Sequence, residues 1–457
     1  MMPPSPPSPP SPPSLVSSPR SPWSRRRLLQ GLAAALLLPA SLRALAAAKA
    51  PTQINILTSY PDDVMARFEA AFEKSHPQYR IRFLWRMPHD ALPYLEQAAQ
   101  APGGETVDVY WAASPRTFSR LKQQRLLRQL ALKDTALPAR IGATQISDPD
   151  GYFVATEVAG YVFAYHQRKL DQLGVAVPRD WPELANPKLL DNIALPVPGE
   201  VGFAPVMFDI VLQAYGWQRG WALWSEVAAL SQLVHRGASF VADLVAPGEA
   251  AIGLSIDFFV KAAIANGATI GQRYPQHNGV NPGHIALPLA GRNKAGADAF
   301  ARFVLSPQGQ ALLAQRDIRK LPVSPQAYAG MDVNEFNPYA AAANGTMNYD
   351  GERGRERLSV IAAVFEQMLA KPHAEMRALW QRVYRAEAAG RDATAARALL
   401  AQPPLDEAGA DDEAVRREFG KNLEGDALPQ QGLALDWSRG CAARRAQAGL
   451  LLDGMAA

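Results

Sequence analysis

Alternation of short apolar runs with amphipathic helical patterns constrains the fold of this chain more than any other feature of its sequence. Strands that alternate with helices predict an α/β fold with a parallel sheet and crossover connections. Ser59 is placed to cap the helix that opens at Pro61. The candidate strands cover residues 53–60, 80–85, 107–111, 152–165, 193–196, 251–256 and 285–288. The candidate helices begin at 61 and 114 or cover 91–100, 205–215, 257–265, 295–305 and 307–315.

The character of the chain changes near residue 331, where helical spacing replaces the alternation. Apolar residues from Leu358 to Met368 are spaced three and four apart, and the pattern resumes at Met376. This spacing predicts a helical hairpin that packs on the α/β body. A Pro-Pro pair and an acidic run after residue 400 predict a solvated tail with one more helix. We therefore assign residues 331–457 to a C-terminal helical extension.

The net positive charge of the chain comes from its first 48 residues. The 457 residues include 47 basic and 43 acidic side chains, a formal net charge of +4. Residues 1–48 hold five arginines and no acidic residue, which leaves 42 basic against 43 acidic side chains from residue 49 onward. A body with a net charge of −1 gives no electrostatic reason to expect a nucleic-acid partner.

Residues 1–48 have the composition of a low-complexity leader followed by an export signal. Residues 24–30, SRRRLLQ, resemble the twin-arginine motif S-R-R-x-F-L-K, and an apolar run at 31–39 precedes small residues at 44–48. These parts predict twin-arginine export and a periplasmic location. The alternative is a transmembrane anchor, but the apolar run is about half of the ~20 residues that span a bilayer. Cys441 is the single cysteine, so we expect neither an intrachain disulfide nor a lipid anchor.

Local motifs of enzymes and metal sites are absent from the sequence. It contains no GxxxxGK[ST] loop, no GxGxxG after a strand, no HExxH and no GxSxG, and its seven histidines lack the spacing of metal ligands. We predict no catalytic site, no metal and no cofactor. A secreted hydrolase whose catalytic residues meet only on folding stays the alternative.

Small and hydroxyl residues gather where the predicted strands end. In open α/β sheets, ligands bind beyond the carboxyl ends of the strands and against helix N-termini. Serine, threonine and aspartate at such positions also serve as helix caps, which is the simpler interpretation of any one junction. Together they predict a binding cleft. The four junctions are 58–60, 112–114, 199–202 and 255–257.

Several segments follow one another along the chain: ILTSYPDDVMARFEAAFEKSHP, DVYWAAS, WPEL, IALPVPGEVG, AIGLSIDFF and SPQGQALLA followed by LPVSP. Their order resembles the periplasmic solute-binding proteins of ABC importers, in the ferric-iron-type branch that includes phosphoglycerate-transport regulatory proteins. The resemblance covers residues 54–389 and implies a two-lobed type II periplasmic binding fold, in which hinge closure traps a ligand. It places lobe 1 at 49–150 and 255–330, and lobe 2 at 151–254.

The implied function is an extracytoplasmic receptor, a monomer that delivers a small molecule or metal complex to an ABC permease. One alternative is a sensor subunit that presents its ligand to a membrane histidine kinase. Another treats the helical extension as a scaffold or docking element. The predicted ligand-binding residues are Thr58, Ser59, Tyr60, Trp111, Ala113, Ser114, Glu157, Gly199, Glu200, Val201, Ser255, Asp257 and Tyr274.

The charge of the ligand stays open at this level. Iron-binding members of the branch use two adjacent tyrosines, and the chain has no Tyr-Tyr pair, so ferric binding in that mode is not expected. Arg116 and Arg273, with backbone N–H groups at the junctions, suit an anion. Glu157, Glu200 and Asp257 suit an amine or a metal-bound solute better.

Overall fold

The structure is a computed structural model that describes residues 50–100, 105–131, 137–235, 240–315, 318–332, 335–420 and 432–456. The predicted leader and its export motif, residues 1–48, lie outside these ranges. Within the described ranges, no helix combines the length and the hydropathy that crossing a membrane requires.

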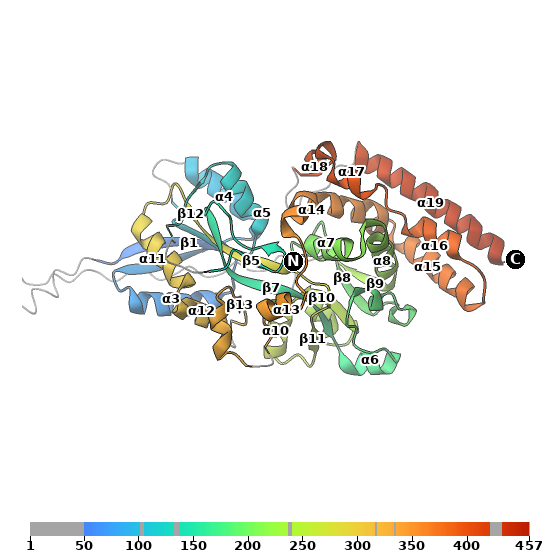
Figure 1. Cartoon of the computed structure of the whole chain (residues 1–457), viewed down its shortest axis with the longest axis horizontal. Helices are drawn as coiled ribbons and strands as arrows, with labels where there is room; N and C mark the ends of the chain where they lie inside the picture. The colour runs from blue at the N-terminus through green and yellow to red at the C-terminus, as the bar shows by residue number, and fades with distance from the viewer. Residues whose placement is uncertain are drawn as a thin grey trace, which may run out of the picture. The chain divides into compact units, whose positions relative to one another are not determined.

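One large sheet runs through the centre of the structure (Figure 1). Its main strands are β1 (Thr52–Thr58), β2 (Tyr79–Trp85), β3 (Val109–Ala112), β7 (Phe153–Tyr165), β8 (Ile193–Pro196), β9 (Ser231–Val234), β10 (Ile252–Ile256) and β12 (Val280–Pro288). They follow the order β2-β1-β3-β12-β7-β10-β8-β9. The short strands β4 (Leu127–Arg128), β11 (Gly271–Arg273) and β13 (Leu321–Pro322) pair with β12 or β7, while β5 (Arg140–Ile141) and β6 (Thr144–Gln145) form a separate pair.

The sheet is mixed, so the prediction of a parallel sheet was wrong for its centre. The outer groups are parallel, with β1 beside β2 and β3, and β8 beside β9 and β10. The three central pairs, β3–β12, β12–β7 and β7–β10, are antiparallel. The physical reason is that β7 carries the chain from one parallel group to the other and β12 brings it back, so the two strands run in opposite directions.

Strand β7 belongs to both halves of the sheet. Residues 153–160 contain its pairs with β12, and residues 161–165 pair with β10. A shift of register between Gly283 and His284 of β12 lies opposite the first of these segments. The change of partner after Gly160 marks the crossing between the two halves.

The half that contains β1–β3 packs its own helices around two apolar clusters. Its helices are α3 (Asp62–Ser75), α4 (Pro88–Gln100), α5 (Pro115–Gln123), α11 (Lys294–Leu305) and α12 (Pro307–Leu313). The prediction that Ser59 caps α3 was wrong. The helix starts at Asp62, so the capping position falls on Pro61, which makes no side-chain cap.

The half that contains β8–β10 has a larger, tryptophan-rich core. Its helices are α6 (Gln167–Leu173), α7 (Ala204–Tyr215), α8 (Trp217–Leu230), α9 (Phe240–Val245) and α10 (Asp257–Ala265), with 3₁₀ turns at Trp181–Leu184 and Pro187–Leu189. Trp181, Trp221 and Trp224 are each at most 1% exposed in this core. A third 3₁₀ turn, Pro325–Gly330, follows β13.

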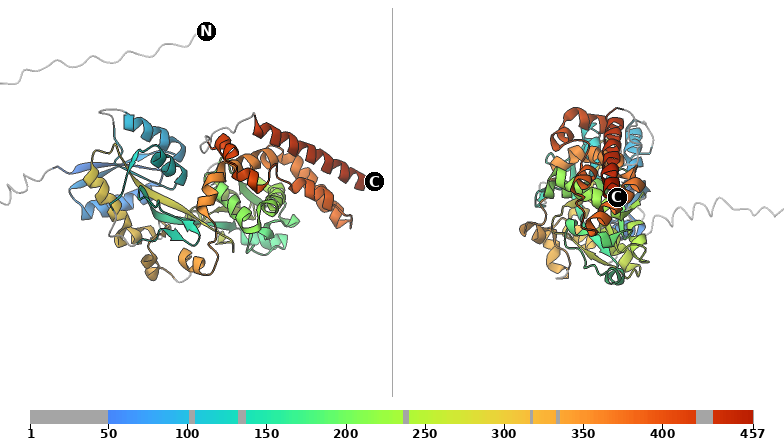
Figure 2. Two further views of the ribbon diagram at one scale, coloured as in Figure 1. Left: turned by 45° about the horizontal axis from the view of Figure 1, so that its top comes forward. Right: turned by 90° about the vertical axis from the view of Figure 1, so that its right-hand side faces the viewer.

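The chain ends in a helical extension that shares this core (Figure 2). It contains α13 (Pro338–Ala343), α14 (Gly351–Phe365), a π-helical turn (Glu366–Ala370), α15 (His373–Ala388), α16 (Thr394–Ala401), α17 (Glu407–Asp411), α18 (Glu413–Phe419) and α19 (Leu433–Ala456). Helices α14, α15 and α16 pack against α7 or α8.

The solvated tail with one further helix was a wrong prediction. Four described helices follow α15, and Leu400, Phe419 and Trp437 from them are buried. The acidic residues that suggested a solvated segment have structural partners, because Asp406 and Asp412 cap α17 and α18.

Candidate functional site

The crossing point of β7 holds a buried carboxylate. Asp257, 1% exposed at the start of α10, accepts hydrogen bonds from the backbone N–H of Gly160 at 3.0 Å and from the Tyr274 hydroxyl at 2.8 Å. Burial raises the pKa of Asp257, and the charge of Lys261 opposes that shift. Ile256, and not Asp257, occupies the cap position of α10, and the Asp257 carboxylate binds the backbone of β7.

A second buried carboxylate belongs to β7 itself, three residues before Gly160. Glu157 is 2% exposed and accepts hydrogen bonds from the hydroxyls of Tyr60 and Thr156 and, at 3.1 Å, from the Lys320 ammonium. The Trp111 indole N–H donates to Thr156 Oγ1 at 3.0 Å. Burial, reinforced by the charge of Glu157, raises the pKa of Tyr60, so this phenol stays a hydrogen-bond donor. Three donors therefore satisfy the two oxygens of Glu157.

Lys320 is the member of this cluster that the sequence reasoning missed. Its ammonium lies 3.9 Å from the centre of the Tyr60 ring and 4.6 Å from that of Phe258 on α10. Arg319, directly before it, has a left-handed backbone with φ of 55°, a conformation that side chains other than glycine seldom adopt. The one local signal was a lysine directly before the segment LPVSP of the family resemblance, and it gives no indication of a partner 163 positions away.

Gly283 makes room for the Glu157 cluster. A Cβ atom at this position would lie 2.2 Å from Glu157 Oε1 and 2.4 Å from the Tyr60 hydroxyl oxygen. We expect Gly283→Ala to lower the free energy of unfolding by about 1–3 kcal/mol, because both side chains must move to accept a methyl group. Urea unfolding followed by circular dichroism measures the change.

Gly330→Ala is the matched control, since a Cβ there would meet no atom within 4 Å. We expect the free energy of unfolding of this variant to stay within about 0.5 kcal/mol of that of the wild type. Equal stability of both variants would show that Tyr60 and Glu157 do not occupy the space beside Gly283.

The structure gathers some predicted ligand residues and separates others. Tyr60, Trp111 and Glu157 meet in one cluster, and Asp257 and Tyr274 meet in the other. Glu200 lies apart on an exposed loop, where its carboxylate approaches His235 Nδ1 at 2.9 Å. The remaining residues are distributed as follows: Thr58, Ser114, Val201 and Ser255 are buried, Ser59 and Gly199 are half-buried, and Ala113 is exposed.

Two of these residues carry a further observation. Ser114 occupies the cap position of α5, yet its hydroxyl lies 2.8 Å from Thr117 Oγ1 and makes no cap bond to the backbone. Ser255 is fully buried, and its Oγ has no hydrogen-bond partner among the described residues. A buried hydroxyl without a partner is unusual in folded proteins.

The two arginines that were predicted to suit an anionic ligand lie on different elements of the structure. Arg116 donates to Ser359 Oγ of α14 at 3.0 Å, so its guanidinium faces the extension. Arg273 is exposed on β11. Among the described residues, no group of three or more His, Cys, Asp or Glu side chains could hold a metal ion.

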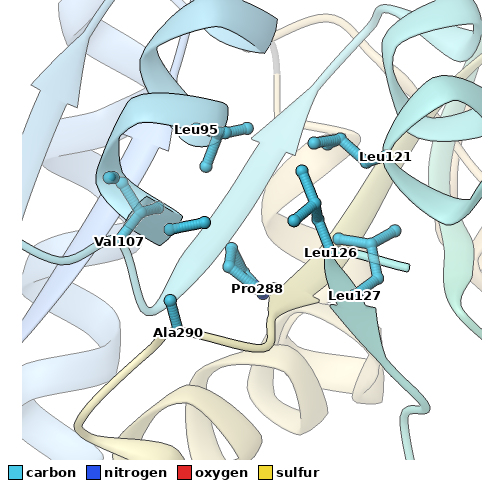
Figure 3. Close-up of a pocket in the computed structure, with 9 residues that line it drawn as sticks. Leu95, Val107, Leu121, Leu126, Leu127, Pro288 and Ala290 are labelled. Atoms are coloured by element: carbon cyan, nitrogen blue, oxygen red, sulfur yellow. The ribbon is translucent and has the colours of Figure 1, made fainter. Parts of the chain in front are cut away.

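Two pockets in the structure lie away from both carboxylates. An apolar cavity of about 10 Å³ between α4 and α5 is too small for a solute (Figure 3). An open polar pocket of about 410 Å³ surrounds Asn55, Asp108 and Arg292, at the end of the sheet where β1 and β3 begin. None of the predicted ligand residues lines either pocket. The small cavity is lined by Leu95, Ala98, Ala99, Val107, Leu121, Leu126, Leu127, Pro288 and Ala290.

Comparison with known protein families decides the class of protein. The family model described as "Bacterial extracellular solute-binding protein" matches residues 104–349, more than half of the chain. This chain belongs to that family. The matched segment contains β7, β10, β12 and both buried carboxylates. The resemblance to solute-binding proteins is therefore confirmed, and the family is one of binding proteins.

Relatives of this solute-binding protein include a curated transport regulator. The phosphoglycerate transport regulatory protein PgtC of Salmonella typhimurium is 26% identical over 338 residues, which cover 71% of this chain and 80% of PgtC. The PgtC of Salmonella typhi matches equally.

Solved structures confirm the two-lobed α/β fold of the solute-binding protein. The periplasmic binding protein AfuA from Actinobacillus pleuropneumoniae, solved with fructose-6-phosphate, matches with a TM-score of 0.57 and 18% identity, over 69% of this chain and 98% of AfuA. Iron-bound HitA from Pseudomonas aeruginosa matches with a TM-score of 0.53 and 16% identity, over 68% of this chain and 98% of HitA. Nearly all of each relative is matched, so this chain carries substantial sequence beyond their common fold.

Proposed function

We propose that this solute-binding protein captures a small solute between its two lobes outside the cytoplasm and delivers it to an ABC permease. The observation that carries the proposal is β7, which pairs with β12 in one half of the sheet and with β10 in the other. A strand shared in this way lets the two halves move about a common axis, as hinge closure requires. The matched family model spans this strand completely.

The proposed contacts with the solute come from the strand ends that flank the crossing. Ser59, Tyr60, Ala113 and Ser114 lie on one side, and Ser255, Asp257 and Tyr274 on the other, with Glu157 on β7 between them. Thr58, Trp111, Gly199, Glu200 and Val201 complete the proposed set. The half-buried Ser59 and the exposed Ala113 leave backbone groups near solvent.

An anionic solute fits this arrangement better than an amine or a metal ion. Glu157, the buried carboxylate on the Tyr60 side of the crossing, is already neutralised by Lys320. The name of PgtC refers to phosphoglycerate, and AfuA was solved with a sugar phosphate. HitA, by contrast, was solved with iron. We therefore place a small phosphorylated or carboxylated solute first.

Residues 1–48 are proposed as the signal for twin-arginine export to the periplasm, and the receptor is proposed to act as a monomer. Native mass spectrometry of protein released from the periplasm tests the location, the oligomeric state and the bound solute together. A protein confined to the cytoplasm, or a dimer in the native spectrum, would contradict these parts of the proposal.

A sensor role is the second candidate, and the word "regulatory" in the name of PgtC favours it. In that role the solute-loaded protein would dock on a membrane histidine kinase. Genes beside this one discriminate the two: a permease supports transport, and a kinase supports sensing.

We expect the true solute to stabilise the protein strongly. At a hundred times its Kd, a ligand raises the free energy of unfolding by about 2.7 kcal/mol, which a thermal-shift panel of phosphorylated acids, organic acids, amines and metal ions detects. A panel in which nothing raises the melting temperature would contradict the receptor proposal.

Two serine variants then test the contacts. Ser255→Ala and Ser59→Ala should each weaken binding about tenfold, equivalent to about 1.4 kcal/mol, with little change of stability. Ser255 is suited to this test because its buried hydroxyl binds no described residue. Ser75→Ala is the control, because Ser75 lies at the far end of α3 and its hydroxyl contacts Ala71, Phe72 and the neighbouring His76. Unchanged affinity in both test variants would overturn the assignment of the site.

A further inference from the structure

The surroundings of the Lys320 ammonium form a complete cation site inside the protein. The rings of Tyr60 and Phe258 lie 3.9 Å and 4.6 Å from its nitrogen, and Glu157 Oε1 accepts its hydrogen bond at 3.1 Å. The side chains of Lys320 and Glu157 are 7% and 2% exposed. Aromatic faces and a carboxylate around a desolvated nitrogen are the groups by which proteins recognise ammonium ligands.

The three walls of this cage come from both sides of the crossing. Tyr60 follows β1 and stacks edge-on against Trp111 at 4.9 Å, which fixes the plane of its ring. Phe258 belongs to α10, which packs on β7, β10 and β11. Glu157 lies on β7 between them. The cage therefore lies at the crossing between the two halves, where the proposed function places the solute.

Other charges near the cage have their own partners. Lys261 of α10 pairs with the exposed Glu335 at 2.7 Å, and Asp257 is held by Gly160 and Tyr274. Lys320 is thus the cation that balances Glu157, and both oxygens of Glu157 already accept hydrogen bonds. A solute with an amine or a metal ion would have to displace a tethered lysine from a buried ion pair.

We propose that Lys320 acts as a built-in ammonium ligand that fills the Tyr60–Phe258–Glu157 cage and thereby closes the cleft to cationic solutes. One consequence of the inference, that the captured solute is anionic or neutral, rests on the proposed function. The cage itself can be tested on the empty protein.

Lys320→Ala with added n-propylammonium chloride is the test. Removing the lysine leaves Glu157 as a buried charge without a partner, which lowers the melting temperature. We expect n-propylammonium to restore the melting temperature of Lys320→Ala and to bind it at least tenfold more tightly than the wild type. Propan-1-ol, similar in size but neutral, and sodium chloride at equal ionic strength should not restore it.

Two further variants separate charge recognition from packing. Glu157→Gln combined with Lys320→Ala should lose the response to n-propylammonium, because the carboxylate of the cage is gone. Lys261→Met should show no response, because that lysine lies outside the cage. If Lys320→Ala folds poorly, its refolding yield with and without n-propylammonium gives the same comparison.

Several outcomes would overturn the inference. Equal rescue by propan-1-ol would show that only a void is filled, and an equal response of the wild type would show that Lys320 does not block the cage. A native solute identified as an amine or a metal cation would overturn the selectivity while leaving the receptor function intact. A positive cage test together with no bound solute would contradict the receptor function alone.

Discussion

Arg357→Met should lower the free energy of unfolding by about 3–5 kcal/mol, because it leaves Asp209 as a buried charge without its partner. Both side chains are 0% exposed, and Arg357 Nε donates to Asp209 Oδ1 at 2.8 Å. Arg357 also pairs with Glu407 of α17 at 3.0 Å, so one side chain joins α7 to two helices of the extension, α14 and α17. Burial raises the pKa of Asp209 even beside this guanidinium, which indicates how costly the isolated carboxylate would be.

The matched control is Arg353→Met on the same helix. Arg353 pairs with Glu407 at 2.8 Å and with Asp411 at 3.3 Å, but its side chain is 44% exposed. An exposed pair contributes about 0–1 kcal/mol, so this variant should unfold near the wild-type midpoint in urea. Combining Arg357→Met with Asp209→Asn should recover part of the loss, since no buried charge then stays unpaired. Equal effects of the two single variants would show that the Arg357 pair is not buried in solution.

Local sequence patterns predicted most of the secondary structure because those patterns depend on near neighbours. The strand at 193–196 has the same bounds in the structure, and the run at 152–165 differs from β7 by one residue. Helix α8 was missed because its own three tryptophans and other apolar residues dominate its sequence. Its polar positions, such as Gln218, Arg219 and Glu226, are too few to make the helical period plain. The antiparallel centre of the sheet was missed because strand direction depends on how distant segments pair.

The candidate site shows the same division. Strand ends are local features, and the reasoning from them selected Tyr60 and Asp257, which the structure places around the crossing of β7. Glu157 was also predicted, although it lies inside a strand and not at one of the four junctions. Their role toward a solute stays a prediction. Lys320 was missed because its partners, Tyr60 and Glu157, are brought to it only by folding. Gly283 was missed for the same reason, since its small size matters only beside those two side chains.

A stop after Gly390, which removes α16 to α19, should prevent the β8–β10 half from folding. Ser225 and Trp217 of α8 donate to the Leu400 and Leu405 carbonyls at 2.8 and 2.9 Å, and both donors would lose their acceptors. The deletion also removes Leu400, Phe419, Trp437 and Leu452, which are all buried. At about 1.5–3 kcal/mol for each large apolar side chain, they contribute roughly 6–12 kcal/mol. The loss is comparable to the whole stability of a typical domain, about 5–15 kcal/mol.

The yield of soluble protein and the near-ultraviolet circular dichroism of the truncated chain measure this effect. A stop after Asp453 is the control, because it leaves all four buried side chains in place and should fold like the full chain. The alternative treats the extension as a separable scaffold or docking element, and it expects the chain ending at Gly390 to fold and bind its solute with unchanged affinity. The tryptophan core that α8 shares with α15 and α16 argues against that outcome. Removing α16 would expose the apolar side chains of α8 that it covers to water, which is unfavourable.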